Sequence, residues 1–441
     1  MAGRPHIVEA EPNTDDQTQS SDQSVNVRLH FILGPTDLNG DGNPATYVHY
    51  LFGETDTHDG YTGLEIEVFM HAGNLKPFFS ITYEERGPAD LLNYIKAELR
   101  LPHCYNSPME LSEGLQKPYA PPGLKIHSYT KSSCVHTVYL ACSDSPGFLE
   151  LHPYLNALPI WFIDGASLID ITEPHWKYFL LYRDTDRGPA LVGLCSVYYF
   201  WTSFNSCRVR LSQFLILPQY QRKGYGSDLL QAIYNHILGD DRVFQITVED
   251  CSEEMQRLRD VVDVQGALQY ISWANSRVTE DNYPMSTVED TELLQKKLKI
   301  TKNQASRCLE LIKLGLLSPE NEHKESPVYR KWRLEVKRRL FRDNYHQLKP
   351  ESQEQKFKHI YIHDDSEAEE EAKIMLQLKS LSPSLFEQIG RYFGMKLVPQ
   401  DSKPDAERKT MLRDMFALIE EEYESVLHKV RELIAARKSV S

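Results

Sequence analysis

The sequence predicts an α/β fold in which a mixed β-sheet is covered by helices. Apolar runs at 176–182, 190–201 and 209–217 have the character of strands, and the turn-rich segment DTDRGP joins the first two into a hairpin. A helix over about 226–238, a strand over 244–248 and a further helix opening at Ser252 or Glu253 follow. The last strands should be parallel in a right-handed βαβ unit, and the first should form an antiparallel meander.

Composition limits the class of protein. The 441 residues are 41% hydrophobic and 25% charged, which is ordinary for a globular chain of about three domains. The seven cysteines are scattered singly, which favours a reducing compartment, cytoplasm or nucleus. A net charge of −14 disfavours nucleic acid and favours basic partners, although acidity can also serve solubility alone. No run of ~18 apolar residues occurs, so no membrane association is expected.

The pattern along the chain divides it into five segments. A polar, acidic tail, expected to be disordered, is followed by a mixed α+β domain with strands near 64–70 and 78–83. Helical spacing dominates from about residue 290, and DDSEAEEE forms an acidic linker within the last segment. The predicted segments are the tail 1–24, the N-terminal α+β domain 25–145, the α/β core 146–285, a helical domain 286–346, and a C-terminal helical extension 347–441.

A glycine-containing loop, Gln221–Ser227, opens the helix of the βαβ unit. Gly224 and Gly226 permit unusual backbone angles and close ligand approach, and amides at a helix N-terminus suit a pyrophosphate. Leu229 stands where a dinucleotide fingerprint needs a third glycine, and the G-K-[ST] ending of a nucleoside triphosphate loop is absent. Two glycines can also begin a helix that binds no ligand, so the loop by itself leaves both interpretations open.

The neighbours of this loop carry a resemblance. Q-x-x-G-x-G after an apolar strand resembles motif A of the GCN5-related N-acetyltransferase superfamily. WFIDGASLIDITEPHWKYFLLY, SQFLILPQYQRKGYGSDLL and ITVEDCSEEMQRLRDVVD further resemble the catalytic subunit of type B histone acetyltransferases, over about residues 25–345. The resemblance implies the mixed-sheet core fold of the GCN5-related N-acetyltransferase superfamily, with acetyl-CoA as cosubstrate and no metal. It implies cofactor contacts from Phe214, Leu215, Ile216, Gln221, Arg222, Lys223, Gly224, Tyr225, Gly226, Ser227 and Ser252; a helix cap is an equally good role for Ser252.

Three carboxylates are candidates for the chemistry. Glu249 and Asp250 end the strand FQITV, at the edge where open α/β sheets bind ligands. A strand-end carboxylate more often caps a helix, but the resemblance makes Glu249 the general base that deprotonates a lysine. The resemblance also places Asp250 and Asp164 at acidic positions. The family more often has glutamate at the position of Asp164, and the shorter side chain reaches less far.

The resemblance also implies a substrate and partners. Glu54 and Asp56 would pair with basic residues of a protein tail, and Tyr198, Tyr199 and Phe200 would pack on its side chains, although alternation along a strand buries one face. The implied substrate is a lysine of newly made histone H4, alone or with its histone partner, and the implied partner is a WD40-repeat histone chaperone. The alternatives are an N-acetyltransferase of the same fold acting on a small amine or another protein, and a non-enzymatic acetyl-CoA-binding scaffold.

Two patterns that resemble metal sites do not predict metal binding, and one basic run is expected to have no binding role. DLNGDGNPATYV begins like a calcium-binding loop but has Val48 where the bidentate glutamate is required. Cys134 and His136 form a lone C-x-H without a partner pair. KRRLFR is expected to be the solvated face of a helix, because apolar residues interrupt it.

Overall fold

The computed structural model describes residues 25–53, 60–202, 205–276, 278–284, 286–317, 324–344, 357–361, 395–399 and 405–440. The predicted tail 1–24 and the acidic run 364–371 lie outside these residues. The chain divides into two compact units, one of residues 1–266 with 288–305 and one of residues 267–287 with 306–441. The predicted five-segment division stays a prediction, and each unit is described by itself.

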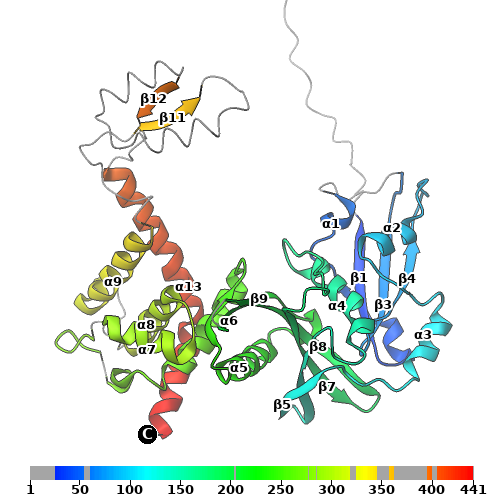
Figure 1. Ribbon diagram of the computed structural model, residues 1–441, viewed down its shortest axis with the longest axis horizontal. Helices are drawn as coiled ribbons and strands as arrows, with labels where there is room; N and C mark the ends of the chain where they lie inside the picture. The colour runs from blue at the N-terminus through cyan, green and yellow to red at the C-terminus, as the bar shows by residue number, and fades with distance from the viewer. Residues whose placement is uncertain are drawn as a thin grey trace, which may run out of the picture. The chain divides into compact units, whose positions relative to one another are not determined.

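A six-stranded mixed sheet forms the centre of the first unit (Figure 1). All neighbouring strands are antiparallel except the pair β9 and β10, which is parallel. The meander followed by a βαβ unit is therefore present, and the predicted fold class is confirmed. In sheet order the strands are β10 (Val243–Val248), β9 (Cys207–Ile216), β8 (Gly188–Trp201), β7 (Trp176–Thr185), β6 (Cys134–Ala141) and β5 (Leu124–Lys131).

The two strands at one edge, β5 and β6, come from the segment that the sequence assigned to the N-terminal domain. They pair with each other as a hairpin, and β6 continues the ladder onto β7. Their mixed polar composition gave no sign of this partner, because strand pairing joins residues far apart in the chain.

Helices cover opposite faces of this sheet. Side chains of β7 alternate between the faces, so Tyr178 and Leu180 join the apolar cluster containing α4 (Phe148–Phe162), whereas Phe179 joins the cluster containing α5 (Tyr225–Leu238). These three side chains are 0–1% exposed. Full burial of each such side chain stabilises the fold by about 1.5–3 kcal/mol. The helix α6 (Glu253–Ala267) follows β10 and packs beside α5, with Leu258 against Gly226.

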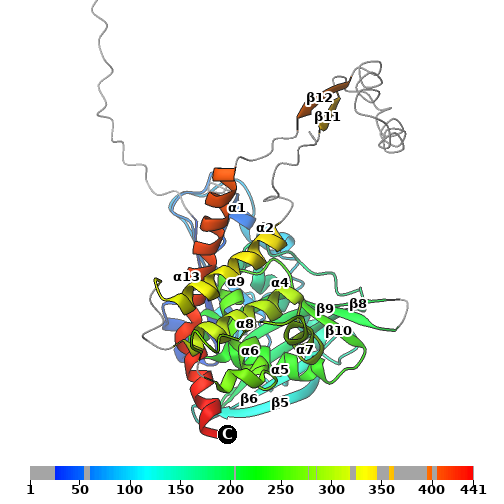
Figure 2. The same ribbon diagram turned by 90° about the vertical axis from the view of Figure 1, so that its left-hand side faces the viewer.

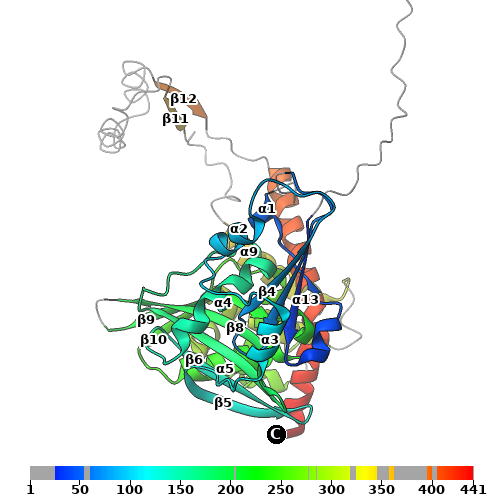
Figure 3. The same ribbon diagram turned by 90° about the vertical axis from the view of Figure 1, so that its right-hand side faces the viewer.

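A four-stranded sheet lies at the N-terminal end of the first unit (Figure 3). Two hydrogen bonds connect this sheet to the larger one. The Leu191 amide donates to the Ala72 carbonyl, and the Tyr182 hydroxyl donates to the Gly73 carbonyl. The elements here are β1 (Asn26–Ile32), β2 (Asn43–Pro44), β3 (Glu65–His71) and β4 (Pro77–Thr82), with helices α1 (His49–Phe52), α2 (Leu91–Glu98) and α3 (Pro108–Leu115).

The second unit is built mainly from helices (Figure 2). Its α8 (Lys302–Leu316), α9 (Pro327–Asp343) and α13 (Asp405–Val440) meet at a buried polar cluster, whereas α7 (Val288–Leu298) belongs to the first unit. The Arg339 guanidinium binds the Glu310 carboxylate at 2.8 and 3.0 Å, and the Tyr423 hydroxyl donates to the same carboxylate at 2.7 Å. The strands β11 (Phe357–Tyr361) and β12 (Met395–Pro399) pair with each other. No helix in the described part of the chain combines the length and apolar character needed to cross a membrane.

Candidate active site

The ladder between β9 and β10 opens before β9 ends. Their pairing runs as far as Val248 opposite Leu211, and the Glu249 amide makes a last contact with the Leu211 carbonyl at 2.9 Å. The remainder of β9, residues 212–216, continues beyond the end of β10. This fork exposes one edge of β9 beside the end of β10, where an extended ligand can pair with backbone groups.

A β-bulge sets the direction of those backbone groups. Between Cys195 and Val197, the single residue Ser196 of β8 faces both Ser212 and Gln213 of β9. The Gln213 amide donates to the buried Ser196 hydroxyl at 3.0 Å, and the Gln213 side-chain amide holds the Ser167 carbonyl at 2.7 Å. Bulges of this kind re-aim a strand next to functional sites.

The bulge decides which predicted residues of β9 face the fork. The amides of Gln213 and Leu217 both donate toward β8. Because backbone groups alternate along a strand, Phe214 and Ile216 turn their amides toward the open edge, as predicted for cofactor contacts. Leu215 turns its amide toward β8 and its side chain is 4% exposed, and its cofactor contact stays a prediction.

Glu249 lies at the mouth of the fork and is held by two side chains of β9. The Ser212 hydroxyl donates to Oε2 at 2.6 Å, and the Arg210 guanidinium lies 3.0 Å from Oε1. The carboxylate is about one third exposed, at 33%, and is therefore accessible to a substrate. Sequence reasoning missed both Arg210 and Ser212, although their alternation along β9 places them on the same face.

The other two predicted carboxylates occupy different surroundings. Asp250 is exposed and has a positive φ of 33°, so it forms the sharp turn after β10. Asp164 follows α4, and the Tyr50 hydroxyl donates to it at 2.6 Å while accepting from the Gly165 amide. The same loop reaches Ser167, which contacts Gln213 of the bulge. The loop with Asp164 thus borders the fork, but its carboxylate is engaged by Tyr50.

The glycine-containing loop has the geometry of an anion cradle. Gly224 is the N-cap of α5 with φ 81°, and Arg222 also has a positive φ of 59°. Gly226 has an ordinary helical backbone, which differs from the prediction. Its lack of a side chain matters for packing, since a Cβ there would lie 3.3 Å from Leu258. The first amides of α5 point outward at the helix N-terminus, where they favour a phosphate.

Several predicted cofactor residues use their side chains to build the loop itself. The Gln221 side chain donates to the Ile216 carbonyl at 2.9 Å, and the Lys223 ammonium donates to the Gln219 carbonyl at 2.7 Å. Ser252 caps α6, because its hydroxyl accepts from the Met255 amide at 3.2 Å. Tyr225 is 7% exposed, whereas Ser227 is partly exposed in the first turn of α5.

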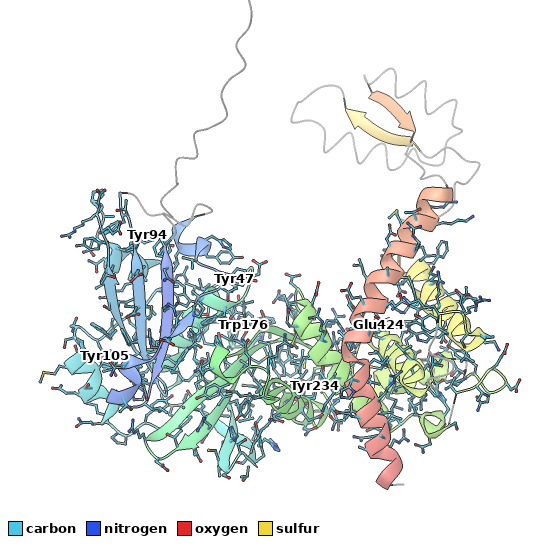
Figure 4. The ribbon with its side chains drawn as sticks, turned by 180° about the vertical axis from the view of Figure 1, so that it is seen from behind. Tyr47, Tyr94, Tyr105, Trp176, Tyr234 and Glu424 are labelled. Atoms are coloured by element: carbon cyan, nitrogen blue, oxygen red, sulfur yellow. The ribbon has the colours of Figure 1, made fainter. Side chains whose placement is uncertain are left out.

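An aromatic ledge, defined as Trp176, Tyr198 and Phe200, extends from Glu249 along the sheet. Trp176, labelled in Figure 4, packs edge-on against Tyr198 with ring centroids 4.9 Å apart. Phe200 lies 4.5 Å from Tyr198 and is 39% exposed, and Arg210 lies over its ring at 4.8 Å. The ledge is therefore continuous with Glu249 through Arg210.

One predicted substrate contact, Tyr199, is not part of this aromatic ledge. Tyr199 lies on the opposite face of β8 with Lys177 over its ring, and its substrate contact stays a prediction. Its side chain is 3% exposed. The reason is strand alternation, which turns Tyr199 into the core. Glu54 and Asp56 lie outside the described residues. Within the described ranges, no group of three or more His, Cys, Asp or Glu side chains could hold a metal ion.

Comparison with known proteins agrees with this geometry. The family model described as "Histone acetyl transferase HAT1 N-terminus" matches residues 18–164, and the "Acetyltransferase (GNAT) family" model matches residues 146–258. A histone acetyltransferase type B catalytic subunit from Mycosarcoma maydis is 31% identical over 369 residues, which cover 74% of this chain and 81% of the relative.

This chain belongs to the type B histone acetyltransferase catalytic subunit family. Relatives with the same description from Mus musculus and Homo sapiens are both 29% identical, over 71% of this chain and 79% and 78% of their own lengths. As a family member with the acetyltransferase domain, the chain is an acetyltransferase enzyme with acetyl-CoA as its cosubstrate. The open edge of β9 and the N-terminus of α5 fit an extended, phosphate-bearing molecule of this kind.

Proposed function

We propose that this protein is a histone acetyltransferase that transfers acetyl from acetyl-CoA to lysine ε-amines in the N-terminal tail of histone H4, with Glu249 as general base. The observation that carries the proposal is the position of Glu249 at the mouth of the fork, held by Ser212 and Arg210. The family names, which specify histone acetylation for the relatives, support the substrate class.

The reaction follows from the residues around the fork. A lysine ammonium has a pKa near ~10.4 and must lose a proton before its nitrogen can attack. Glu249, directly or through one water, accepts that proton, and the free amine attacks the acetyl carbonyl. Open-edge amides of Phe214 and Ile216 stabilise the negative charge that develops on the carbonyl oxygen. The carbon–sulfur bond then breaks, and coenzyme A leaves as the thiol after taking up a proton.

Cofactor and substrate take separate parts of the site in this proposal. The phosphates of acetyl-CoA lie on the Gln221–Ser227 loop, and the pantetheine arm lies along the edge of β9. The histone tail crosses the aromatic ledge, where Tyr198 and Phe200 pack on lysine stems, each contact contributing ~0.5–1 kcal/mol. The net charge of −14 attracts a basic tail.

We further propose cytoplasmic and nuclear localisation and association with a WD40-repeat histone chaperone. The seven cysteines are scattered singly along the sequence, which supports a reducing compartment. Chaperone association is tested by mixing the two purified proteins with histone H4 and looking for co-elution in size-exclusion chromatography; separate elution at micromolar concentrations opposes it.

The substrate is tested with labelled acetyl-CoA and three acceptors: a histone H4 tail peptide, spermidine and an unrelated basic peptide. Label should enter the H4 peptide most efficiently, and Glu249→Gln should abolish most of it. Label in spermidine alone would instead make the chain a small-amine N-acetyltransferase. Equal labelling of both peptides would remove the specificity for H4, and no labelling with intact cofactor binding would indicate a scaffold.

A further inference from the structure

A lysine from a distant part of the chain lies against the cofactor loop. Lys131 ends β5, and the turn into β6 is formed by Ser132 and Ser133, both with positive φ (50° and 62°). Two such residues make the tight hairpin turn that matches strand twist. The register pairs Lys131 with Cys134, so the hairpin fixes the lysine at its tip.

Three contacts locate the ammonium group of Lys131. Its Nζ lies 2.6 Å from the Asp228 carboxylate and 4.8 Å from the centroid of the Tyr225 ring. It also lies 2.9 Å from the position that a Cβ on Gly224 would occupy. The ammonium therefore sits beside the N-cap of α5, and the side chain remains 31% exposed.

Asp228 explains why a cation is needed here. A carboxylate in the first turn of a helix is favourable for the helix dipole, but it repels an incoming phosphate. Lys131 neutralises this charge and keeps further N–H donors available, since an ammonium has three. The ammonium group of Lys223, the lysine within the loop, instead donates to the Gln219 carbonyl.

We propose that Lys131 is a cofactor-binding residue whose ammonium contacts a phosphate of acetyl-CoA. The inference rests on the proposed position of the phosphates on the Gln221–Ser227 loop. The phosphate belongs either to the pyrophosphate or to the 3′-phosphate on the ribose, and both offer the same charged oxygen acceptors.

Calorimetric titration of the full chain with coenzyme A and with dephospho-coenzyme A, which lacks the 3′-phosphate, tests the proposal. Lys131→Met should raise the Kd for coenzyme A about tenfold, as expected for one charge-assisted hydrogen bond at a partly exposed site. Lys131→Arg should recover most of the affinity. Lys125→Met, an exposed lysine of the same strand, is the matched control and should bind like the wild type.

The two ligands separate the two phosphates. Weakening that is confined to coenzyme A assigns Lys131 to the 3′-phosphate, and equal weakening for both ligands assigns it to the pyrophosphate. In turnover, Lys131→Met should raise the KM for acetyl-CoA and leave kcat unchanged.

Asp228→Asn separates ligand binding from a merely structural ion pair. It removes the partner but keeps the ammonium, so the Kd should stay the same or fall. A Kd that rises as much in Asp228→Asn as in Lys131→Met would overturn the inference, and so would unchanged binding in Lys131→Met. Absence of binding by the wild type would overturn the loop placement as well.

Discussion

The exchange Glu249→Gln tests the proposed chemistry most directly. The amide has the shape of the carboxylate and can still accept a hydrogen bond from Ser212, which lies 2.6 Å from Oε2 in the wild type. It cannot take up a proton from a lysine. The ion pair with Arg210 is lost, but both side chains are about one third exposed, at 34% and 33%, so solvent screens this loss. The fold should therefore survive, and the change isolates the proton transfer.

The size of the effect follows from the role of a general base. Positioned proton transfer contributes ~10²–10⁴ in rate. At about 1.36 kcal/mol per factor of ten, the exchange should raise the activation barrier by about 3–5 kcal/mol. The Kd for acetyl-CoA should stay unchanged, because the amides of α5 that we propose bind its phosphates are not altered.

The assay is steady-state acetylation of an H4 tail peptide from pH 6 to pH 9. Turnover of Glu249→Gln should lie ~10²–10⁴-fold below that of the wild type throughout this range. Glu253→Gln is the matched control, since Glu253 pairs with Arg257 and its side chain is 71% exposed. Unchanged turnover of Glu249→Gln across the whole pH range would remove Glu249 from its role.

Three further changes probe the loop, the core of the first unit and the second unit. Gly226→Trp should weaken acetyl-CoA binding at least tenfold, because even a Cβ would lie 3.3 Å from Leu258; an unaltered Kd in titration would refute the loop placement. Burial lowers the pKa of His152 from 6.5 to about 4. The unfolded chain therefore binds more protons between these values, and up to about 3 kcal/mol of stability present above pH 6.5 is lost toward pH 4. His152→Gln should flatten this dependence in denaturant unfolding, and a wild-type profile would contradict it. Lys313→Met should destabilise the second unit by about 3–5 kcal/mol, because it leaves the Glu335 carboxylate, which lies 2.6 Å from the Lys313 ammonium, without its ion-pair partner. Stability is measured by hydrogen exchange, and the added exchange Glu335→Gln should restore it.

Local patterns were enough to predict the core elements. Apolar runs place β7, β8, β9 and β10 within a few residues of their observed bounds, because strand propensity and burial depend on a handful of neighbours. The loop before α5 was predictable for the same reason. Gly224 adopts a positive φ that other residues rarely tolerate, so the local sequence is enough to indicate this turn.

The surroundings of Glu249 depend on pairing between strands. Arg210 and Ser212 reach it only because β9 runs parallel to β10 and the ladder stops at Leu211. The bulge opposite Ser196 has no sequence signal, since it depends on which strand lies alongside. The burial of Tyr199 could not be predicted for the same reason. Which aromatic side chain of β8 is buried depends on which face of the assembled sheet is covered.

The sequence by itself determined the order of the core elements, the glycine-containing loop before α5 and the position of Glu249 at a strand end, and its resemblance identified the family. Only the tertiary structure decided that β5 and β6 extend the core sheet and that Lys131 lies beside Gly224. The physical reason is that helices, turns and alternating strands are stabilised by near neighbours. Sheet order, bulges and ion pairs such as that of Lys131 with Asp228 arise from contacts between residues distant in the chain.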